Sequence, residues 1–120
     1  MRIVIDLDGT ICAIKQPGQS YAELAPVTGA AEKLRELRHR GHYIIIHTAR
    51  NMATCESNLG KVMKNVGLIT LQWLEKHGIE YDELWFGKPN AEVYLDDRGI
   101  RFTGWDQITE EKLLQESRPR

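Results

Sequence analysis

The sequence has little of several features that would point to a specialised class of protein. It contains only two cysteines, Cys12 and Cys55, and no C-x-x-C spacing, so a disulfide scaffold is not indicated. No apolar run approaches the roughly 18–20 residues that a membrane-spanning helix needs. Met1-Arg2 leads directly into an apolar stretch without a signal-peptide pattern. We therefore expect a cytoplasmic protein with unpaired thiols and no membrane contact.

The chain also lacks an excess of charge of either sign. Its formal net charge is −1, which gives no broad basic field and argues against nucleic acid as a partner. Repeats and low-complexity segments are absent as well. What is present is 120 residues with 42% hydrophobic content, enough for one compact domain with a core. We predict a single domain over residues 1–120.

The most informative stretch is residues 3–10, Ile-Val-Ile-Asp-Leu-Asp-Gly-Thr. The short β-branched run predicts a buried strand, and Asp6 and Asp8 follow at its C-terminal end. Two carboxylates one residue apart repel each other, so the pair requires a compensating cation or a proton. This stretch therefore predicts a metal site.

A strand, a helix and a second strand follow each other early in the chain. Thr28 is the predicted N-cap of a helix that continues to about Arg40, and residues 43–46 form the second apolar strand. This βαβ unit predicts parallel strands joined with a right-handed crossover. The fold class that we predict is a Rossmann-like three-layer α/β fold with a central, mainly parallel sheet.

The rest of the chain is predicted to extend this arrangement. The loop of residues 11–25 is either a plain connection or a mobile flap over the strand end. Lys88 precedes a strand with no room for a helix between them, so we expect it to approach from a loop. Residues 59–77 form either one helix or a helix broken at Gly60 or Gly67, with Met63 and Trp73 in the core. The further predicted elements are strands at 83–86 and 92–95, an edge strand at 100–102, and a terminal helix at 109–115.

Parallel strands end at one edge of a sheet, so the polar groups that follow these strands are predicted to share one crevice. Oxygen ligands from carboxylates suit Mg²⁺, which takes its remaining ligands from water and substrate phosphate. A lysine offsets the local negative charge, and a hydroxyl donates to a phosphate oxygen. The predicted group is Asp6, Asp8, Thr48, Lys88, Asp96 and Asp97.

These residues occur in the order of four motifs of a known superfamily. Residues 6–10 are Asp-Leu-Asp-Gly-Thr, an apolar strand ends at Thr48, Lys88 follows, and Asp96-Asp97 comes last. The sequence thus resembles the haloacid dehalogenase (HAD) superfamily of phosphohydrolases. Within this superfamily, the segments at residues 48–52, 87–89 and 95–97 resemble those of the capsule-polysaccharide biosynthesis phosphatases.

The resemblance implies a role for each residue. Asp6 would be the nucleophile, and Asp8 would protonate the leaving oxygen and then activate water. Thr48 and Lys88 would hold the phosphoryl oxygens. The implied Mg²⁺ ligands are Asp6, Asp8 through its backbone carbonyl, and Asp96. Asp97 is either a ligand through a water molecule or a partner for Lys88 or Arg98. The predicted substrate-binding residues are Gly9, Thr10, Lys15, Ala49, Arg50 and Asn51.

Two alternatives stay open for individual features. Arg50 either clamps an anionic group of the substrate or forms an ion pair with one of the crowded aspartates. The chain has no room for a cap domain, so the resemblance implies either a bulky substrate or a lid from a neighbouring subunit of a homo-oligomer.

The predicted function is a Mg²⁺-dependent phosphomonoesterase that acts on a small phosphorylated sugar, polyol or related metabolite. One alternative is a polynucleotide 3′-phosphatase, suggested by the Thr-x-Arg pattern at Thr48 and Arg50 but opposed by the near-neutral charge. Another is a catalytically silent binding or scaffolding module, which would be expected to lack Asp6 or Asp8.

Overall fold

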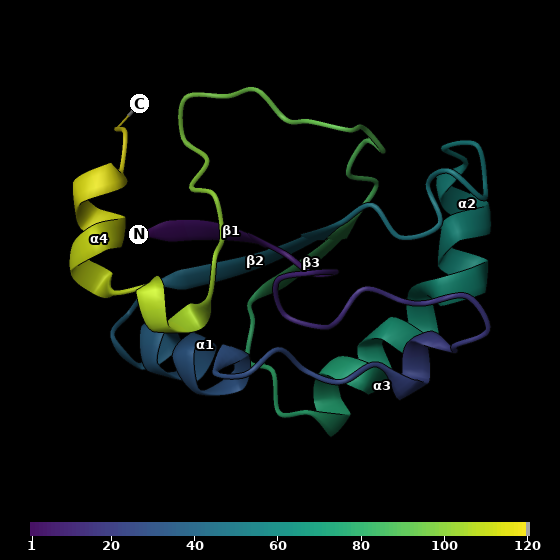
Figure 1. Cartoon of the computed structure of the whole chain (residues 1–120), viewed down its shortest axis with the longest axis horizontal. Helices are drawn as coiled ribbons and strands as arrows, with labels where there is room; N and C mark the ends of the chain where they lie inside the picture. Colours follow the sequence, from purple (N-terminus) through teal and green to yellow (C-terminus); the bar gives the residue numbers. More distant parts are fainter. Residues whose placement is uncertain (120) are drawn as a thin grey trace.

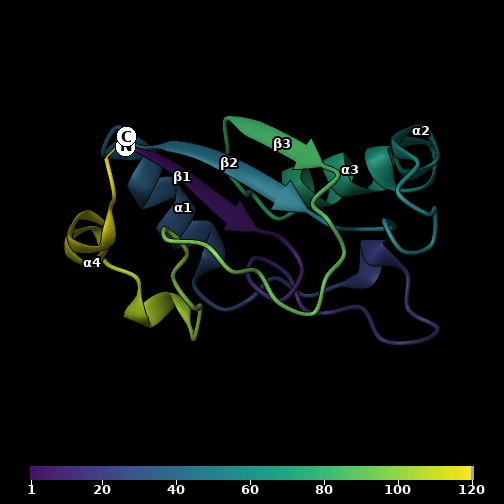
Figure 2. The same ribbon diagram turned by 90° about the horizontal axis from the view of Figure 1, so that it is seen from above.

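The computed structural model of the chain describes residues 1–119 and contains a three-stranded parallel sheet in the order β1-β2-β3. The strands are β1 (Arg2–Asp6), β2 (Tyr43–Thr48) and β3 (Glu83–Phe86), and their arrows all point the same way in Figure 2. Asp6 lies opposite His47, and Thr48 lies opposite Phe86. The predicted Rossmann-like α/β fold is confirmed, and so is the parallel pairing of the first two strands.

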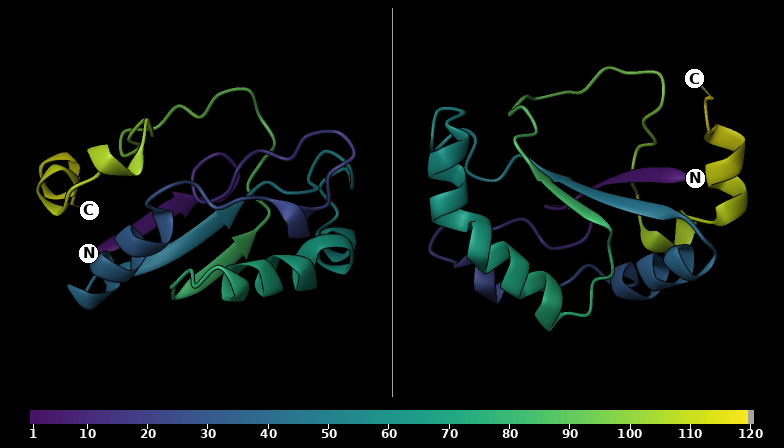
Figure 3. Two further views of the ribbon diagram at one scale, coloured as in Figure 1. Left: turned by 60° about the horizontal axis from the view of Figure 1, so that its bottom comes forward. Right: turned by 180° about the vertical axis from the view of Figure 1, so that it is seen from behind.

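The helices gather on one face of this sheet (Figures 1 and 3). They are α1 (Ala30–His39), between β1 and β2, and a long helix made of α2 (Leu59–Val62), η2 (Met63–Gly67) and α3 (Leu68–Lys76), between β2 and β3. Both crossovers step across the sheet in the same direction, so right-handed connections put both helices on the same side. The segment that joins β3 to the C-terminal elements arches over the opposite side.

Helix α1 forms largely as its sequence predicts. Leu34 and Leu37 are buried, as their helical spacing requires. The predicted N-cap Thr28 is wrong, because the cap is Gly29 in a left-handed conformation with φ of 87°. A Cβ atom at Gly29 would lie 3.1 Å from Cβ of Trp105, so the close packing of Trp105 adds a second reason for glycine.

The predicted helix over residues 59–77 is confirmed, although its middle is wound as a π-helix. The residues that flank this π-helical turn keep right-handed helical backbone angles, so the helix is continuous. Trp73 is buried as predicted, whereas Met63 is 47% exposed and the prediction that it belongs to the core is wrong. Met63 instead lies along the helix surface, where its Cε would come 3.1 Å from a Cβ at Gly67.

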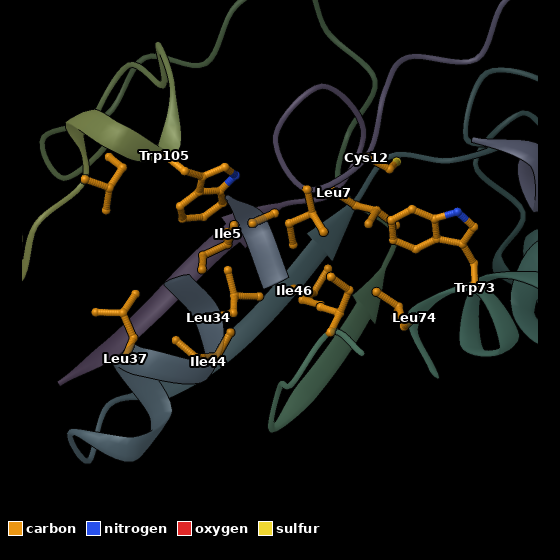
Figure 4. Packing of buried hydrophobic residues seen from close by; sticks show 14 of the residues in the cluster. Ile5, Leu7, Cys12, Leu34, Leu37, Ile44, Ile46, Trp73, Leu74 and Trp105 are labelled. Carbon is orange, nitrogen blue, oxygen red and sulfur yellow. The ribbon is translucent and has the colours of Figure 1, made fainter. Parts of the chain in front are cut away.

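The main core lies between the sheet and the helices (Figure 4). Ile44 and Ile46 of β2 are fully buried against Leu34 of α1 and Leu74 of α3. Trp73 donates its indole N–H to the carbonyl of Leu24 over 2.7 Å, which ties the loop of residues 11–25 to α3. This loop contains a 3₁₀ turn, η1 (Tyr21–Glu23), that begins with a capping box at Ser20.

The last third of the chain departs most from the predictions. The strands predicted at residues 92–95 and 100–102 are wrong, since residues 88–104 form neither helix nor strand. Leu95 is 98% exposed and Val93 is 69% exposed, so the apolar side chains of residues 92–95 stay outside the core, whereas Phe102 packs against it beside Trp105. A strand needs a neighbour to pair its backbone groups, and nothing in the described chain pairs with these residues. The 3₁₀ turn η3 (Trp105–Gln107) and helix α4 (Glu110–Glu116) follow, and the terminal helix is confirmed.

Two absences bear on the site. Residues 1–119 carry no inserted cap domain between the strands. Within the same residues, no helix has both the length and the apolar character that crossing a membrane demands.

Candidate active site

The chain turns sharply where β1 ends, and this turn presents Asp8. The carbonyl of Leu7 accepts backbone N–H groups from Thr10 at 3.2 Å, Ile11 at 2.8 Å and Cys12 at 3.1 Å. Gly9 has φ of +89°, a conformation that side chains other than glycine's rarely allow. Because Leu7 is fully buried below the turn, the flanking carboxylates of Asp6 and Asp8 stay at the edge of the sheet.

Asp6 faces a lysine from the loop after β3. The Nζ atom of Lys88 lies 3.3 Å from Oδ1 of Asp6, and the backbone N–H of Lys88 donates to the carbonyl of Thr48 over 3.1 Å. The ammonium group also lies 4.4 Å from the centre of the Tyr94 ring, a cation–π contact. Lys88 is thus held by a loop, as predicted, and its charge is set directly against Asp6.

Asp8 is held by two residues at the end of β2. The hydroxyl of Thr48 donates to Oδ2 of Asp8 over 3.1 Å, and Nε of Arg50 lies 3.0 and 3.1 Å from its two oxygens. The side chain of Arg50 is only 1% exposed. Of the two alternatives for Arg50, the ion pair is the one that the structure contains; direct contact with a substrate stays a prediction.

The sequence predicts a compensating cation or a proton for the carboxylates of Asp6 and Asp8. In the structure, each of them forms an ion pair within the chain. Asp6 has Lys88, and Asp8 has Arg50. Ion pairs of this kind neutralise much of the mutual repulsion that the sequence implies. The side chains of Asp6 and Asp8 are 36% and 27% exposed, so both still face solvent and a ligand.

Two neighbouring groups show the electrostatic character of the site. Burial lowers the pKa of His47, and the positive charge of Lys88 lowers it further, so this imidazole is neutral near pH 7. Burial, together with the charge of Asp8, raises the pKa of the Cys12 thiol to about 12. Cys12 is thus a thiol, not a thiolate, and it donates its S–H to Oδ1 of Asp8, with 3.4 Å between Sγ and Oδ1.

A pocket of about 380 Å³ lies over these carboxylates. It brings together most of the predicted catalytic and substrate-binding residues, while Gly9, Thr10 and Thr48 are not part of its lining. Thr48 is fully buried, and its hydroxyl donates a hydrogen bond to Asp8. The predicted residues that line the pocket are Asp6, Asp8, Lys15, Ala49, Arg50, Asn51 and Lys88.

Asp96 and Asp97 are not assembled with the first pair. Both lie in the exposed segment of residues 88–104, and Asp96 accepts the backbone N–H groups of Arg98 and Gly99 over 2.6 and 2.7 Å. These bonds, the first of them above all, lower the pKa of the Asp96 carboxyl. No group of three or more histidine, cysteine, aspartate or glutamate side chains in residues 1–119 is arranged to hold a metal ion. The predicted four-carboxylate centre is therefore not formed in this structure.

Sequence reasoning missed several residues of the site. Cys12 and Thr70 contact the guanidinium of Arg50, and Tyr94 covers Lys88. Thr70 is fully buried in a helix whose pattern drew attention to Met63 and Trp73 instead. A buried threonine within an apolar helix face is a weak signal, because only the fold shows which buried charge it serves.

A second hollow, of about 460 Å³, lies between α1 and α4. Its lining includes Arg40 and Glu110, which form an ion pair with each other at 3.4 Å. Its glutamates Glu36 and Glu110 form ion pairs with the half-exposed Arg40, and none of the predicted site residues lines it, so we place the candidate active site at the smaller pocket.

Known structures resemble the chain to very different degrees. No protein-family model matches it, and no curated protein sequence does. The crystal structure of a structural-genomics target from Vibrio cholerae superposes with a TM-score of 0.85 and 36% identity, over 96% of this chain and 94% of that one. The name of that structure states no function.

More distant neighbours share the fold alone. The Pnkp1/Rnl/Hen1 RNA repair complex matches with a TM-score of 0.50 and 24% identity, over 81% of this chain and 28% of that one. A D,D-heptose 1,7-bisphosphate phosphatase from B. bronchiseptica, complexed with magnesium and phosphate, matches with a TM-score of 0.49 and 14% identity, over 77% of this chain and 53% of that one. The first of these two likenesses shows the fold alone, and the second carries no argument.

The match to the Vibrio cholerae structure covers nearly the whole of both chains, and the two sequences are 36% identical. The sheet, its crossovers and the aspartate pair at the end of β1 agree with the HAD-like fold that the motifs imply. The chain belongs to the same family as the Vibrio cholerae protein.

Proposed function

We propose that the protein is a phosphomonoesterase that works through a phosphorylated Asp6. The observation that carries this proposal is the unequal setting of two carboxylates on one strand end. Asp6 lies beside the partly exposed Lys88, while Asp8 is fixed by Thr48 and Arg50. One carboxylate is free to attack, and the other is held in place to exchange protons.

The reaction balances with these two groups. Asp8 must enter the reaction protonated. An Oδ atom of Asp6 forms a bond to phosphorus as the ester P–O bond breaks, and the leaving oxygen takes the proton from Asp8. Asp8 then takes a proton from a water molecule, whose oxygen bonds to phosphorus as the bond to Asp6 breaks. The products are an alcohol and inorganic phosphate, and both aspartates return to their starting states.

Lys88 and Thr48 complete the phosphate site in this proposal. The ammonium group of Lys88 lies beside Asp6 at 3.3 Å, where it would offset charge on the transferring phosphoryl group. Thr48 keeps Asp8 in place through its hydroxyl bond, and its predicted bond to a phosphoryl oxygen stays part of the proposal.

Magnesium fits the chemistry of the residues that are present. Mg²⁺ commonly takes one or two protein carboxylates and completes its shell with other oxygens, water and phosphate; Asp6 offers such a carboxylate at the pocket, and Asp8 would offer its backbone carbonyl while its carboxyl exchanges protons. The bound ion would supply positive charge to the substrate phosphate. Asp6 and Asp8 would hold it, and we keep Asp96 and Asp97 as proposed further donors, since Tyr94, two residues before Asp96, lines the same pocket.

The substrate that we propose is a small phosphorylated sugar, polyol or related metabolite, consumed in capsule or surface polysaccharide biosynthesis. Polar side chains that suit hydroxyl groups line the pocket, among them Lys15, Asn51 and Asn90. Residues 1–119 hold no cap domain to close it, and we propose that a neighbouring subunit of a homo-oligomer supplies a lid.

The test is phosphate release from a panel of monoesters, measured with and without Mg²⁺. The panel contains para-nitrophenyl phosphate, hexose and polyol phosphates, and a 3′-phosphorylated oligonucleotide. The proposal expects Mg²⁺-dependent release from a small ester and none with Asp6→Asn. Equal release by the wild-type protein and Asp6→Asn, or no release from any ester, contradicts it. Release confined to the oligonucleotide would show a polynucleotide 3′-phosphatase instead.

A further inference from the structure

Arg50 is the most enclosed charged side chain of the site, and every nitrogen of its guanidinium has a protein partner. Nε lies 3.0 and 3.1 Å from the two oxygens of Asp8, Nη1 lies 3.0 Å from the hydroxyl of Thr70, and Nη2 lies 3.3 Å from Sγ of Cys12. The Tyr21 ring covers the group, with its centre 4.3 Å from Cζ. Arg50 lines the pocket, but its side chain is only 1% exposed and each of its three nitrogens is already engaged by a protein partner.

The partners of Arg50 come from separate parts of the fold. Thr70 belongs to α3, Cys12 to the turn after β1, and Tyr21 to η1. A planar guanidinium with partners on its edges and a ring on its face can rotate or shift only if several of these elements move. The direction of Nε, and with it the position of the Asp8 carboxylate, is therefore set by α3 and by the loop of residues 11–25.

Lys88 provides the contrast within the same pocket. Its side chain is 21% exposed, and its only ion-pair partner among the described residues is Asp6 at 3.3 Å. A flexible ammonium can turn from Asp6 to an incoming phosphate, whereas the enclosed guanidinium of Arg50 has no such freedom. The two cations therefore differ in kind: one is placed to meet the ligand, and the other is placed behind a carboxylate.

We propose that Arg50 is a positioning residue for Asp8 and not a substrate ligand, with Thr70 as the anchor that fixes it from α3. The proposal rests on the proposed phosphomonoesterase function, because Asp8 exchanges protons only if its carboxylate stays over the reacting bond. A shift of about 1 Å in such a group costs about a hundredfold in rate. The pair Arg50 and Thr70 thus acts on the rate of the chemical step and not on phosphate binding.

The experiment compares two variants. Thr70→Val keeps the shape of the side chain and removes its hydroxyl, whereas Thr70→Ser keeps the hydroxyl and removes the methyl group. With para-nitrophenyl phosphate as the substrate, Thr70→Val lowers kcat about tenfold while KM and the inhibition constant of inorganic phosphate stay within about twofold. Thr70→Ser has a kcat close to that of the wild-type protein and well above that of Thr70→Val. Arg50→Lys, where it folds, lowers kcat about a hundredfold with the same constant phosphate affinity.

Val66→Ala is the matched control for lost stability. Val66 is buried in the same long helix and contacts neither Arg50 nor Asp8 by any hydrogen bond, so this variant lowers the melting temperature and leaves kcat unchanged. If Thr70→Val loses the same stability without a loss of kcat, the role of Thr70 is structural and the inference is overturned.

A different result would overturn the inference in favour of a substrate clamp. In that case Arg50→Lys or Thr70→Val raises KM and the inhibition constant of inorganic phosphate together, with little change in kcat. If Arg50→Lys does not fold, the Thr70 variants decide alone. Wild-type protein without turnover would refute the proposed function and this inference with it, whereas active wild-type protein with unaffected Thr70→Val refutes the inference alone.

Discussion

The chain contains two acidic pairs with similar sequence settings and very different structural ones. Asp6 and Asp8 end a strand that is hydrogen-bonded along β2, and each faces a cation that another part of the chain supplies. Asp96 and Asp97 follow an equally apolar stretch, but that stretch is exposed and Asp96 caps its own turn. Strand pairing, and not the apolar pattern alone, decides which carboxylates the fold brings into a site.

This difference predicts unequal costs when each pair is altered. The first pair is built into the sheet edge, so its loss removes chemistry. The sheet does not position Asp96 and Asp97. We therefore expect their replacement to change activity only by weakening Mg²⁺ binding. The predictions below are arranged from the largest expected effect to the smallest.

Asp6→Asn has the largest expected effect, because an amide cannot replace the attacking carboxylate. We expect kcat for para-nitrophenyl phosphate to fall on the order of 10⁴-fold, with the melting temperature within a few degrees of wild type. Phosphate release and thermal unfolding measure the two quantities. Residual activity above a tenth of wild type would show that Asp6 is not the nucleophile.

Lys88→Gln removes the charge that faces Asp6 and retains part of the side chain. Loss of one group that stabilises developing charge in a transition state costs about 10²–10³-fold, and we expect a fall in kcat of this order. Lys112→Gln, on α4, is the matched control and keeps full activity. Equal activity of the two variants would show that Lys88 serves only to neutralise Asp6 in the resting protein.

Asp96→Asn separates the two acidic pairs most directly. If Asp96 donates to Mg²⁺, its replacement weakens Mg²⁺ binding about 10- to 100-fold, and saturating Mg²⁺ restores most of the activity. Calorimetric titration with Mg²⁺ measures the affinity, with Asp106→Asn as the control. Unchanged Mg²⁺ affinity would remove Asp96 from the metal site and leave the Asp6 carboxylate and the Asp8 backbone carbonyl as the proposed protein donors.

Trp73→Phe tests the contact that holds the loop of residues 11–25, which follows Asp8, against α3. The variant loses the indole bond to the carbonyl of Leu24, which is 2.7 Å long and buried, and leaves that carbonyl without a partner. We expect a loss of about 1–3 kcal/mol in the free energy of unfolding, measured by urea denaturation. No loss would mean that the loop of residues 11–25 is not tied to α3 in solution, as a mobile flap requires.

Asp82 gives the pH dependence of stability, away from the site. The backbone N–H of Ile44 and then the guanidinium of Arg38 hold the pKa of the Asp82 carboxyl below its usual value. A depressed folded pKa stabilises the protein above the normal carboxyl pKa of about 4, and this contribution is lost as the pH falls through the folded pKa. Asp82→Asn should therefore be less stable than wild type at pH 7, and the difference should shrink below pH ~4. A pH-independent difference would contradict this assignment.

Much of the fold could be predicted because its signals are local and reinforce each other. Apolar runs of the right length gave β1, β2 and β3, and helical spacing gave α1 and the long helix. Because parallel strands end at the same edge of a sheet, the predicted pairing of β1 and β2 then placed Asp6, Asp8 and Thr48 at one edge without any distance being known. The HAD-like resemblance and the topology agree on that point.

The parts that could not be predicted depend on contacts between distant residues. Whether residues 92–95 pair with a strand is decided by the path of the whole segment of residues 88–104, not by their own apolar character. The enclosure of Arg50 requires Thr70, 20 residues away, and Cys12, 38 residues away, neither of which carries a recognisable motif. The hydroxyl of Thr48 likewise has a visible motif, but its bond to Asp8 emerges only from the fold.

The central claim is that Asp6 becomes phosphorylated while Asp8 exchanges protons. The direct measurement is acid quenching of the protein during turnover of para-nitrophenyl phosphate, followed by borohydride reduction and mass spectrometry of the peptides. Reduction of an aspartyl phosphate yields homoserine, and we predict homoserine at position 6 alone, absent when Asp6→Asn is treated alike. Turnover with no homoserine at any position, or homoserine at position 8, would contradict the account.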